Sequence, residues 1–204
     1  MRQENWELLF ALGEEQHGAF TTAQAAYLGI DGHALARAKR DRIIDRIRPG
    51  VHAVIALIDD WTPMAALQLA QPRAVAGYRA GARLHGFDGV DAVALDVLVP
   101  PNVWLRGATI HRVEDLVVPE IVIVEGLRCT DEVRTLIDYA ATTDDDHVER
   151  AMESVFRRTP EQRALLVDRA TTLSRPGKSG PARALRVEST LPETRTDSDL
   201  ETVY

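Results

Sequence analysis

Residues 18–55 read GAFTTAQAAYLGIDGHALARAKRDRIIDRIRPGVHAVI and contain the pattern from which the N-terminal fold can be predicted. A short apolar pair, Ala19-Phe20, precedes two short helical patterns that a glycine-containing turn separates. Two β-prone segments then flank Pro49-Gly50, which is suited to the centre of a type II turn. The order strand, helix, turn, helix and hairpin predicts a winged helix-turn-helix, a type of module that reads duplex DNA.

Side chains that can cap helices mark where the second and third helices begin. Thr21 or Thr22 can accept a hydrogen bond from an unpaired backbone N–H of the second helix. Asp31 can do the same for the third helix, where its charge suits the positive end of the helix dipole. Gly29 supplies the backbone freedom that the turn between them needs. We expect the inward face of the second helix to consist of Ala23, Ala26 and Tyr27.

The third helix divides into an apolar face and a cationic face. Leu35 and Ala38 share the face that we expect to pack inward, and Arg37 and Arg40 lie on the other with His33. Arginine can read guanine with two hydrogen bonds or simply hold phosphate. In the wing, Ile43 and Ile47 are expected on one side of the strand and Arg46 and Arg48 on the other. The predicted DNA-binding residues are His33, Arg37, Lys39, Arg40, Arg42, Arg46 and Arg48.

The charge of the chain is unevenly distributed. Six of the 24 basic residues lie between Arg37 and Arg48, whereas the 204-residue chain as a whole has a formal net charge of -7. Between Glu114 and Glu153 twelve acids face three arginines. A local basic patch on an acidic body suits binding to DNA at one surface. A solvated helix face, or a winged helix that contacts only protein, remains open as an alternative.

Composition excludes several other classes of protein. No apolar run is long enough to span a membrane, and Glu4 and Glu7 stand where a signal peptide would be apolar, so we expect a cytoplasmic protein. Cys129 is the only cysteine, which leaves no internal disulfide and no zinc site of paired thiolates. Gly177-Lys178-Ser179 resembles the end of a phosphate-binding loop, but the earlier glycine and a preceding strand are missing.

The rest of the chain predicts a mixed α+β domain. We expect the winged helix-turn-helix over residues 1–58, the α+β domain over 59–173, and a linker with an incomplete, flexible C-terminal tail over 174–204. The expected strands are 92–99, 108–113 and 121–124, and the expected helices are 64–70, 74–84, 131–141, 147–157, 160–173 and 182–189.

Several short motifs carry a resemblance to a known family. They are Gly18 with Phe20 and Thr21, Arg46 with Pro49-Gly50-Val51, His85-Gly86, Val97 to Pro100, His111-Arg112, Gly126 to Thr130, and Arg134 to Ala140. With these motifs, residues 5–190 resemble the AbiEi-type antitoxin and transcriptional regulator family, in an actinobacterial variant. The chain departs from the family pattern where Arg42 replaces a glycine after the third helix and His52 replaces a tyrosine in the wing.

The resemblance implies an N-terminal domain that binds an operator and an antitoxin-like domain behind it. In such type IV systems the regulator represses its own operon and opposes a nucleotidyltransferase toxin without forming a stable complex with it. Many related chains continue into a Vsr-like endonuclease domain, and Ser198-Asp199-Leu200-Glu201 is similar to its opening. The other acids and the lysine of that metal site are missing, so we expect no catalysis, and neither a metal nor another cofactor. A truncated relative of such a nuclease fusion, which binds DNA without cleaving it, remains the alternative to an antitoxin-type regulator.

The family motifs also indicate a possible site in the second domain, made of His111, Arg112, Arg134 and Asp138. Arg134 and Asp138 are four residues apart on one predicted helix, where an ion pair can be purely structural. A lone strand histidine such as His111 is also more often structural than functional. Cys129 would need an orienting group beside His111 to act as a nucleophile, and none can be placed.

Overall fold

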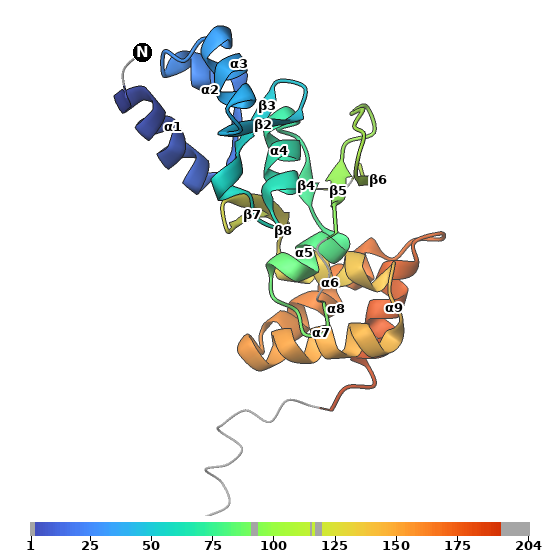
Figure 1. The fold of residues 1–204 in the computed structure, drawn as a ribbon. Helices are drawn as coiled ribbons and strands as arrows, with labels where there is room; N and C mark the ends of the chain where they lie inside the picture. The colour runs from blue at the N-terminus through green and yellow to red at the C-terminus, as the bar shows by residue number, and fades with distance from the viewer. Residues whose placement is uncertain (1–2, 91–93, 115, 117–119, 193–204) are drawn as a thin grey trace, which may run out of the picture. The chain divides into compact units, whose positions relative to one another are not determined.

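The structure is a computed structural model that describes residues 3–90, 94–114, 116 and 120–192 (Figure 1). The contacts divide the chain into two compact units, each built from several separate segments. The first unit is Met1–Ala76, Val97–Leu116 and Ile123–Arg128, and the second is Gly77–Asp96, Val117–Val122 and Cys129–Tyr204. The domain limits that the sequence suggests, after residues 58 and 173, stay predictions.

The chain up to residue 76 contains the predicted winged helix-turn-helix, and one further helix follows it. Three helices accompany a three-stranded antiparallel sheet in the order β1-β3-β2. The elements are α1 (Gln3–Glu15), β1 (Ala19–Thr21), α2 (Thr22–Tyr27), α3 (Gly32–Arg40), β2 (Ile44–Arg48), β3 (Val51–Val54), η1 (Ile55–Leu57), α4 (Thr62–Ala70) and β4 (Val75–Ala76).

The core of this module lies between its helices and one face of the sheet. Leu9 of α1, Phe20 of β1 and Ile44 of β2 are fully buried, and Leu35 packs against them from α3. Ile43, which we expected on the same side of the strand as Ile47, precedes β2 and is 42% exposed, whereas Ile44 pairs with Val54 and is buried.

The remaining strands form a five-stranded sheet in the order β6-β5-β4-β8-β7. The sequence predicted β7 (Ile121–Val124) but missed β8 (Leu127–Thr130). Glu125 and Gly126 join the two strands, and both have a positive φ, as a type I′ hairpin turn requires. A Glu-Gly pair is a weaker hairpin signal than Asn-Gly, which explains why the hairpin could not be read from the sequence. The other strands are β5 (Asp96–Val99) and β6 (Thr109–Arg112).

Two expected elements differ because pairing at a distance overrides local helix propensity. The predicted helix 74–84 is divided into β4 and α5 (Tyr78–Leu84), since Val75 and Ala76 pair with Leu98 and Val97 of β5. The predicted strand 92–99 begins only at Asp96, and residues 91–93 lie outside the described part. Val75 is buried by this pairing, at 3% exposure.

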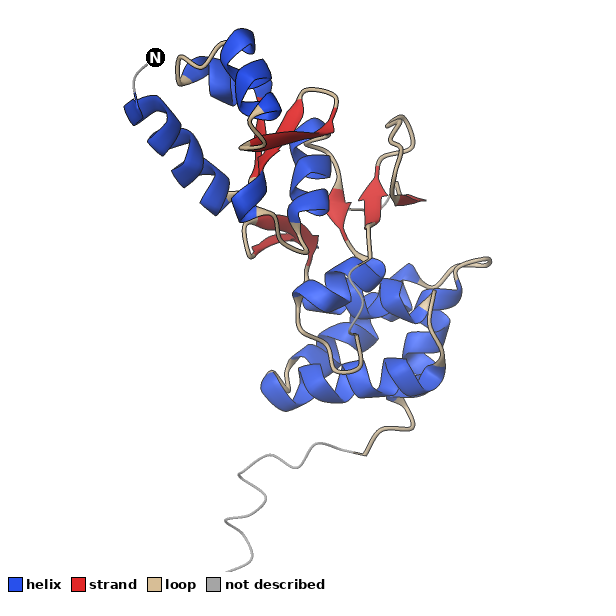
Figure 2. Cartoon of the chain, viewed as in Figure 1, coloured by secondary structure: helices blue, strands red, loops and turns tan. Residues whose placement is uncertain are grey.

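Most of the second unit is helical where it is described (Figure 2). Its core joins Leu136 and Ile137 to Met152 and Leu166 from the following helices. The helices after β8 are α6 (Glu132–Ala140), α7 (Asp145–Arg158), α8 (Gln162–Leu173) and α9 (Ser179–Glu188). Among the described residues, no helix is both long and apolar enough to cross a membrane.

Helix α9 begins three residues earlier than predicted and packs against α6 and α8. Gly180 explains the close packing, because a Cβ placed there would lie 2.5 Å from the carbonyl oxygen of Ile137. Pro181 is tolerated in the first turn, where its missing N–H has no helical partner. Part of the expected linker is therefore buried helix. Residues 193–204, which include the nuclease-like motif Ser198 to Glu201, lie outside the described residues.

Candidate nucleic-acid interface

Local capping bonds fix the position of α3 relative to α2. Thr21 accepts a hydrogen bond from the backbone N–H of Gln24, and the Gln24 side chain bonds back to the N–H of Thr21, 2.7 Å away. This capping box satisfies two N–H groups that would otherwise be unpaired. Gly29 takes φ +75° in the turn, and Asp31 accepts a 2.8 Å bond from the N–H of Ala34. The predictions for the caps and the turn are confirmed.

One face of α3 is buried in the core and the other is exposed to solvent. Leu35 and Ala38 are buried, at 4% and 3% exposure, as their spacing predicted. The free face is cationic. The exposed predicted site residues on α3 are His33, Arg37, Lys39 and Arg40. A helix held in this way presents its cations from a rigid support, so little entropy is lost when they meet a partner.

Arg42 follows α3 at the position where the family pattern has a glycine. It takes φ +55°, the left-handed conformation that glycine adopts without cost. The backbone path into the wing is therefore kept, at the cost of some local strain. The Arg42 side chain is exposed next to the cations of α3, and the N–H of Ile43 still bonds to the carbonyl of Ala38, at 2.9 Å.

The wing is a tight hairpin with one irregularity. Arg46 pairs with His52 and Arg48 pairs with Val51, so that Ile47 is an extra residue in β2. Such a bulge bends a strand and increases its twist. Gly50 takes φ +73° in the turn, as the Pro-Gly pair predicted.

Electrostatic contacts join the wing to α3. Lys39 Nζ lies 3.3 Å from Asp45 Oδ1, although both side chains are about half exposed, which makes the pair weak. A hydrogen bond from the N–H of Arg46, and then Lys39, hold the pKa of Asp45 below its usual value. Burial lowers the pKa of His52, and the charges of Arg46 and Lys39 lower it further, so its ring is neutral at neutral pH.

Arg48 differs from the other predicted DNA-binding residues. Its side chain is partly buried, and it donates to two backbone carbonyls of the loop between β5 and β6. Nη1 lies 2.8 Å from the oxygen of Arg106, and Nη2 lies 3.3 Å from the oxygen of Gly107. Arg48 thus connects the wing to a segment that lies far away in the sequence.

The four residues predicted as an antitoxin-domain site fall into different units. His111 and Arg112 lie on β6 of the first unit, and the Arg112 guanidinium lies 5.6 Å from the ring centre of Trp104. Arg134 and Asp138 lie on α6 of the second unit.

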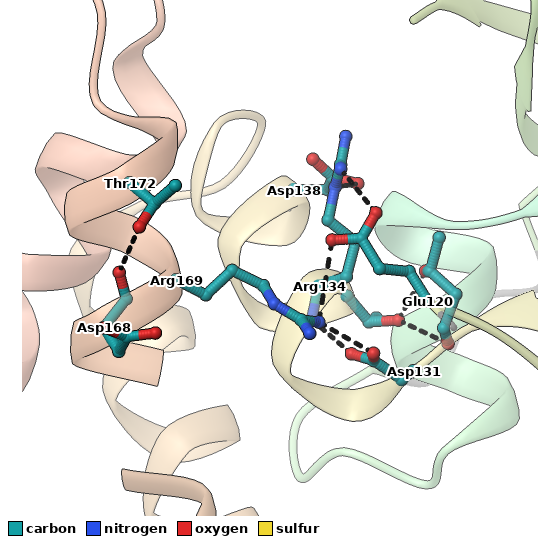
Figure 3. A network of polar contacts seen from close by, with 9 residues as sticks. Glu120, Asp131, Arg134, Asp138, Asp168, Arg169 and Thr172 are labelled. Carbon is teal, nitrogen blue, oxygen red and sulfur yellow. Dashed lines mark hydrogen bonds and ion pairs between the residues drawn. The ribbon is translucent and has the colours of Figure 1, made fainter. Parts of the chain in front are cut away.

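Arg134 belongs to a buried network of charges (Figure 3). Its Nε lies 2.9 Å from Asp138 Oδ2 and its Nη1 lies 3.2 Å from Glu120 Oε2. Arg169 Nη1 contacts Asp131 Oδ2 at 2.8 Å and Glu120 Oε1 at 3.6 Å. Asp131 also caps α6, because its side chain accepts a hydrogen bond from the N–H of Arg134. Arg134 is only 2% exposed, so the centre of the network lies inside the unit, whereas Arg169 at its edge is 33% exposed.

Cys129 lacks the surroundings of a catalytic thiol. It is fully buried, and burial raises the pKa of its thiol to about 12. Its Sγ lies 3.6 Å from His85 Nε2, but the same nitrogen lies 2.7 Å from the carbonyl oxygen of Thr130. A carbonyl only accepts, so Nε2 donates there and cannot take the thiol proton. Within the described residues, no group of three or more His, Cys, Asp or Glu side chains could hold a metal ion.

Comparison with known proteins gives a family match for the N-terminal part. Residues 7–55 match the family described as "Transcriptional regulator, AbiEi antitoxin". This N-terminal segment is therefore similar to that family of regulators. The resemblance seen in the sequence is thereby confirmed over about a quarter of the chain. The match spans α1 to the end of the wing, which are the elements that position α3.

Other comparisons add little to the AbiEi-type match. The crystal structure of the RV2827C protein from Mycobacterium tuberculosis is similar to this chain with a TM-score of 0.48 and 13% sequence identity. That similarity covers 96% of this chain and 84% of the other. No curated protein matches the chain.

Sequence reasoning missed two exposed aromatic residues. Tyr27 was expected inside α2 but is 92% exposed, as are Ala23 and Ala26 in large part, while Ala25 is buried. In a helix of six residues that is rich in alanine, the apolar face is poorly defined by the pattern. Trp104 is 87% exposed in the loop after β5, where nothing in the local sequence distinguishes it.

Proposed function

We propose that the protein is a DNA-binding transcriptional regulator of the type IV antitoxin kind, which represses its own operon and opposes a nucleotidyltransferase toxin. The observation that carries the proposal is the row of exposed cations on α3, whose other face is sealed in the core. The AbiEi-type match over residues 7–55 supports it independently, because the family is one of transcriptional regulators.

The dimensions of α3 fit the major groove of B-DNA. An α-helix with its side chains is about 10–12 Å across, so α3 can lie in a major groove about 12 Å wide. We assign base contacts to Arg37 and Arg40, because both project from the free face. Lys39 and Arg42 contact phosphate, and Arg46 holds the flanking backbone from the wing.

A gel-shift experiment tests the role of α3. The probe is a labelled duplex of the DNA directly upstream of the protein's own gene. Arg37→Ala/Arg40→Ala is expected to lose about 1–3 kcal/mol for each arginine that reaches a base. The matched control is Arg150→Ala/Arg175→Ala, which removes the same charge from exposed positions of the second unit. If the α3 variant binds as the wild type does, the assignment of α3 is wrong.

The dependence on salt gives a second measure of the same contacts. Every phosphate that a cation neutralises releases counterions, so the affinity should fall steeply with salt concentration. The Arg37→Ala/Arg40→Ala variant should show a smaller slope only if one of these arginines holds phosphate. A wild-type protein that binds no duplex at any salt concentration refutes the proposal.

The antitoxin role needs a separate test. The protein is co-expressed with a nucleotidyltransferase encoded next to its gene, and growth is compared with that of cells that hold the toxin alone. We expect growth to be restored without a stable complex in a pull-down experiment. Arg134 and Asp138 contribute by holding the second unit together and do not contact a partner. Failure to restore growth would leave a DNA-binding regulator without an antitoxin role.

A further inference from the structure

The loop between β5 and β6, residues 100–108, is a second exposed cationic element beside the wing. Arg106 is exposed in the loop, and Arg112 is exposed in β6 directly after it. The sequence has no Asp or Glu between Asp96 and Glu114, although the whole chain has a net charge of -7. The loop therefore extends the basic surface that begins on α3.

The position of this 100–108 loop is fixed by contacts within the first unit. The guanidinium of Arg48 bridges the carbonyl oxygens of Arg106 and Gly107, as described above. Val103 is buried, at 4% exposure, and its N–H bonds to the carbonyl of Pro100 at 3.0 Å. Figure 1 shows the turn of the wing and this loop at the end of the unit where α3 lies. The loop is thus held where the wing can present it to the same partner.

Trp104 forms a cation–π contact with Arg112. Its ring is 87% exposed, and the Arg112 guanidinium lies 5.6 Å from the ring centre. A cation over an indole ring is attracted by its negative face, which limits the orientations that the guanidinium can take. Less entropy is then lost when Arg112 binds an anion, so Trp104 acts as a positioning residue for Arg112.

We propose that the 100–108 loop and Arg112 form a second DNA-binding element, which contacts the phosphates of the duplex beyond the wing. This inference rests on the proposed DNA-binding function and names additional residues for it. Arg106 and Arg112 each contact phosphate, Trp104 orients Arg112, and Arg48 fixes the loop against the wing. Recognition of the backbone at the flank adds affinity and register without reading the base sequence.

Hydroxyl-radical footprinting and titrations with salt test this element on the duplex from upstream of the protein's gene. Arg106→Ala/Arg112→Ala should weaken binding about tenfold and reduce the salt slope by about 2, because two phosphate contacts are lost. The DNA segment that this variant protects should be shorter at one flank, and the bases that α3 covers should stay protected. The control Arg150→Ala/Arg175→Ala removes the same charge from the second unit and should keep the wild-type slope.

Two variants test the positioning role of Trp104. Trp104→Ala should lose the flank protection partly and weaken binding about threefold, whereas Trp104→Phe should restore most of both, because phenylalanine also attracts a cation. All these side chains are exposed, so circular dichroism should show the wild-type fold. A Trp104→Ala footprint equal to that of the wild type would remove the role of Trp104.

The outcomes separate this inference from the proposed function. If Arg106→Ala/Arg112→Ala keeps the wild-type affinity, slope and footprint while Arg37→Ala/Arg40→Ala loses binding, the loop element is refuted and the role of α3 stands. A control that falls as far as the loop variant refutes the element as well, because net charge alone would then explain the loss. If the wild-type protein binds no duplex, both proposals fail.

Discussion

Removal of Arg134 should destabilise the second unit more than removal of any exposed arginine. The Arg134 side chain is 2% exposed and contacts Asp138 and Glu120, whose side chains are 9% and 6% exposed. In Arg134→Ala the two carboxylates lose this cation inside the unit. Breaking a buried ion pair from one side typically costs about 3–5 kcal/mol. Arg169 remains 3.6 Å from Glu120, which favours the lower end of that range.

Such a loss is a large fraction of the stability of an ordinary domain, which is about 5–15 kcal/mol. The free energy of unfolding is measured with urea and far-ultraviolet circular dichroism. Arg150→Ala on α7 serves as the control and should stay within about 0.5 kcal/mol of the wild type. In an Asp138→Ala background, Arg134→Ala should cost less, because one of the carboxylates is already gone.

A small effect would refute this reasoning. If Arg134→Ala costs less than about 1 kcal/mol, the network behaves like an exposed ion pair and does not hold the unit together. An equal cost of Arg134→Ala with and without Asp138→Ala would show that the pair of Arg134 with Asp138 contributes no coupling energy.

Three further predictions concern the first unit. Asp31→Ala removes the cap of α3 and should cost about 1 kcal/mol in thermal unfolding. Gly18→Ala should cost more than about 1 kcal/mol, because φ is +80° and a Cβ would lie 2.8 Å from the oxygen of Leu57. His17 lies 2.8 Å from Asp59, and His17→Gln should reduce the dependence of the melting temperature on pH.

The direction in which stability changes with pH follows from the pKa shifts of His17 and Asp59. Burial alone would lower the pKa of His17, but its bonds to Asp59 and to the carbonyl of Glu125 raise it overall. Both ring nitrogens face acceptors, so both contacts are satisfied only when the ring is protonated. The contribution of His17 is complete below its unfolded pKa, about 6.5, and is lost as the pH rises through the higher folded value.

At low pH, protonation of Asp59 removes the stability that its contact with His17 provides. Burial would raise its pKa, but the hydrogen bond and charge of His17 lower it overall. Its contribution is present above the unfolded pKa, about 4, and is lost as the pH falls through the lower folded value. Wild-type stability should therefore decline above about pH 6.5 while His17→Gln changes less. Parallel pH profiles, or an unchanged melting temperature in either of the other two variants, would contradict these assignments.

Local rules predicted the parts of the fold that depend on neighbours in the sequence. Thr21, Gly29 and Asp31 have the roles in capping and turning that their chemistry indicates, and Leu35 lies in the core as its spacing requires. These features need only a few residues on either side. The same holds for the wing turn at Pro49-Gly50, where two residue types fix the backbone.

Interactions between distant residues could not be predicted in this way. Val75 and Ala76 lie in an alanine-rich stretch that favours a helix, and only their pairing with β5 makes them a strand. The contact of Arg48 with the 100–108 loop joins residues almost sixty positions apart, so local patterns predicted a phosphate contact in its place. For the same reason Glu120 was not foreseen as a partner of Arg134.

The way in which the two units share the chain has a consequence for any attempt to isolate them. The boundaries lie after residues 76, 96, 116, 122 and 128, so the polypeptide passes between the units five times. No single cut yields either unit intact, and truncation at residue 58 or 76 would take away strands that the remainder uses. Dissection by point substitution will therefore be more informative than dissection by deletion.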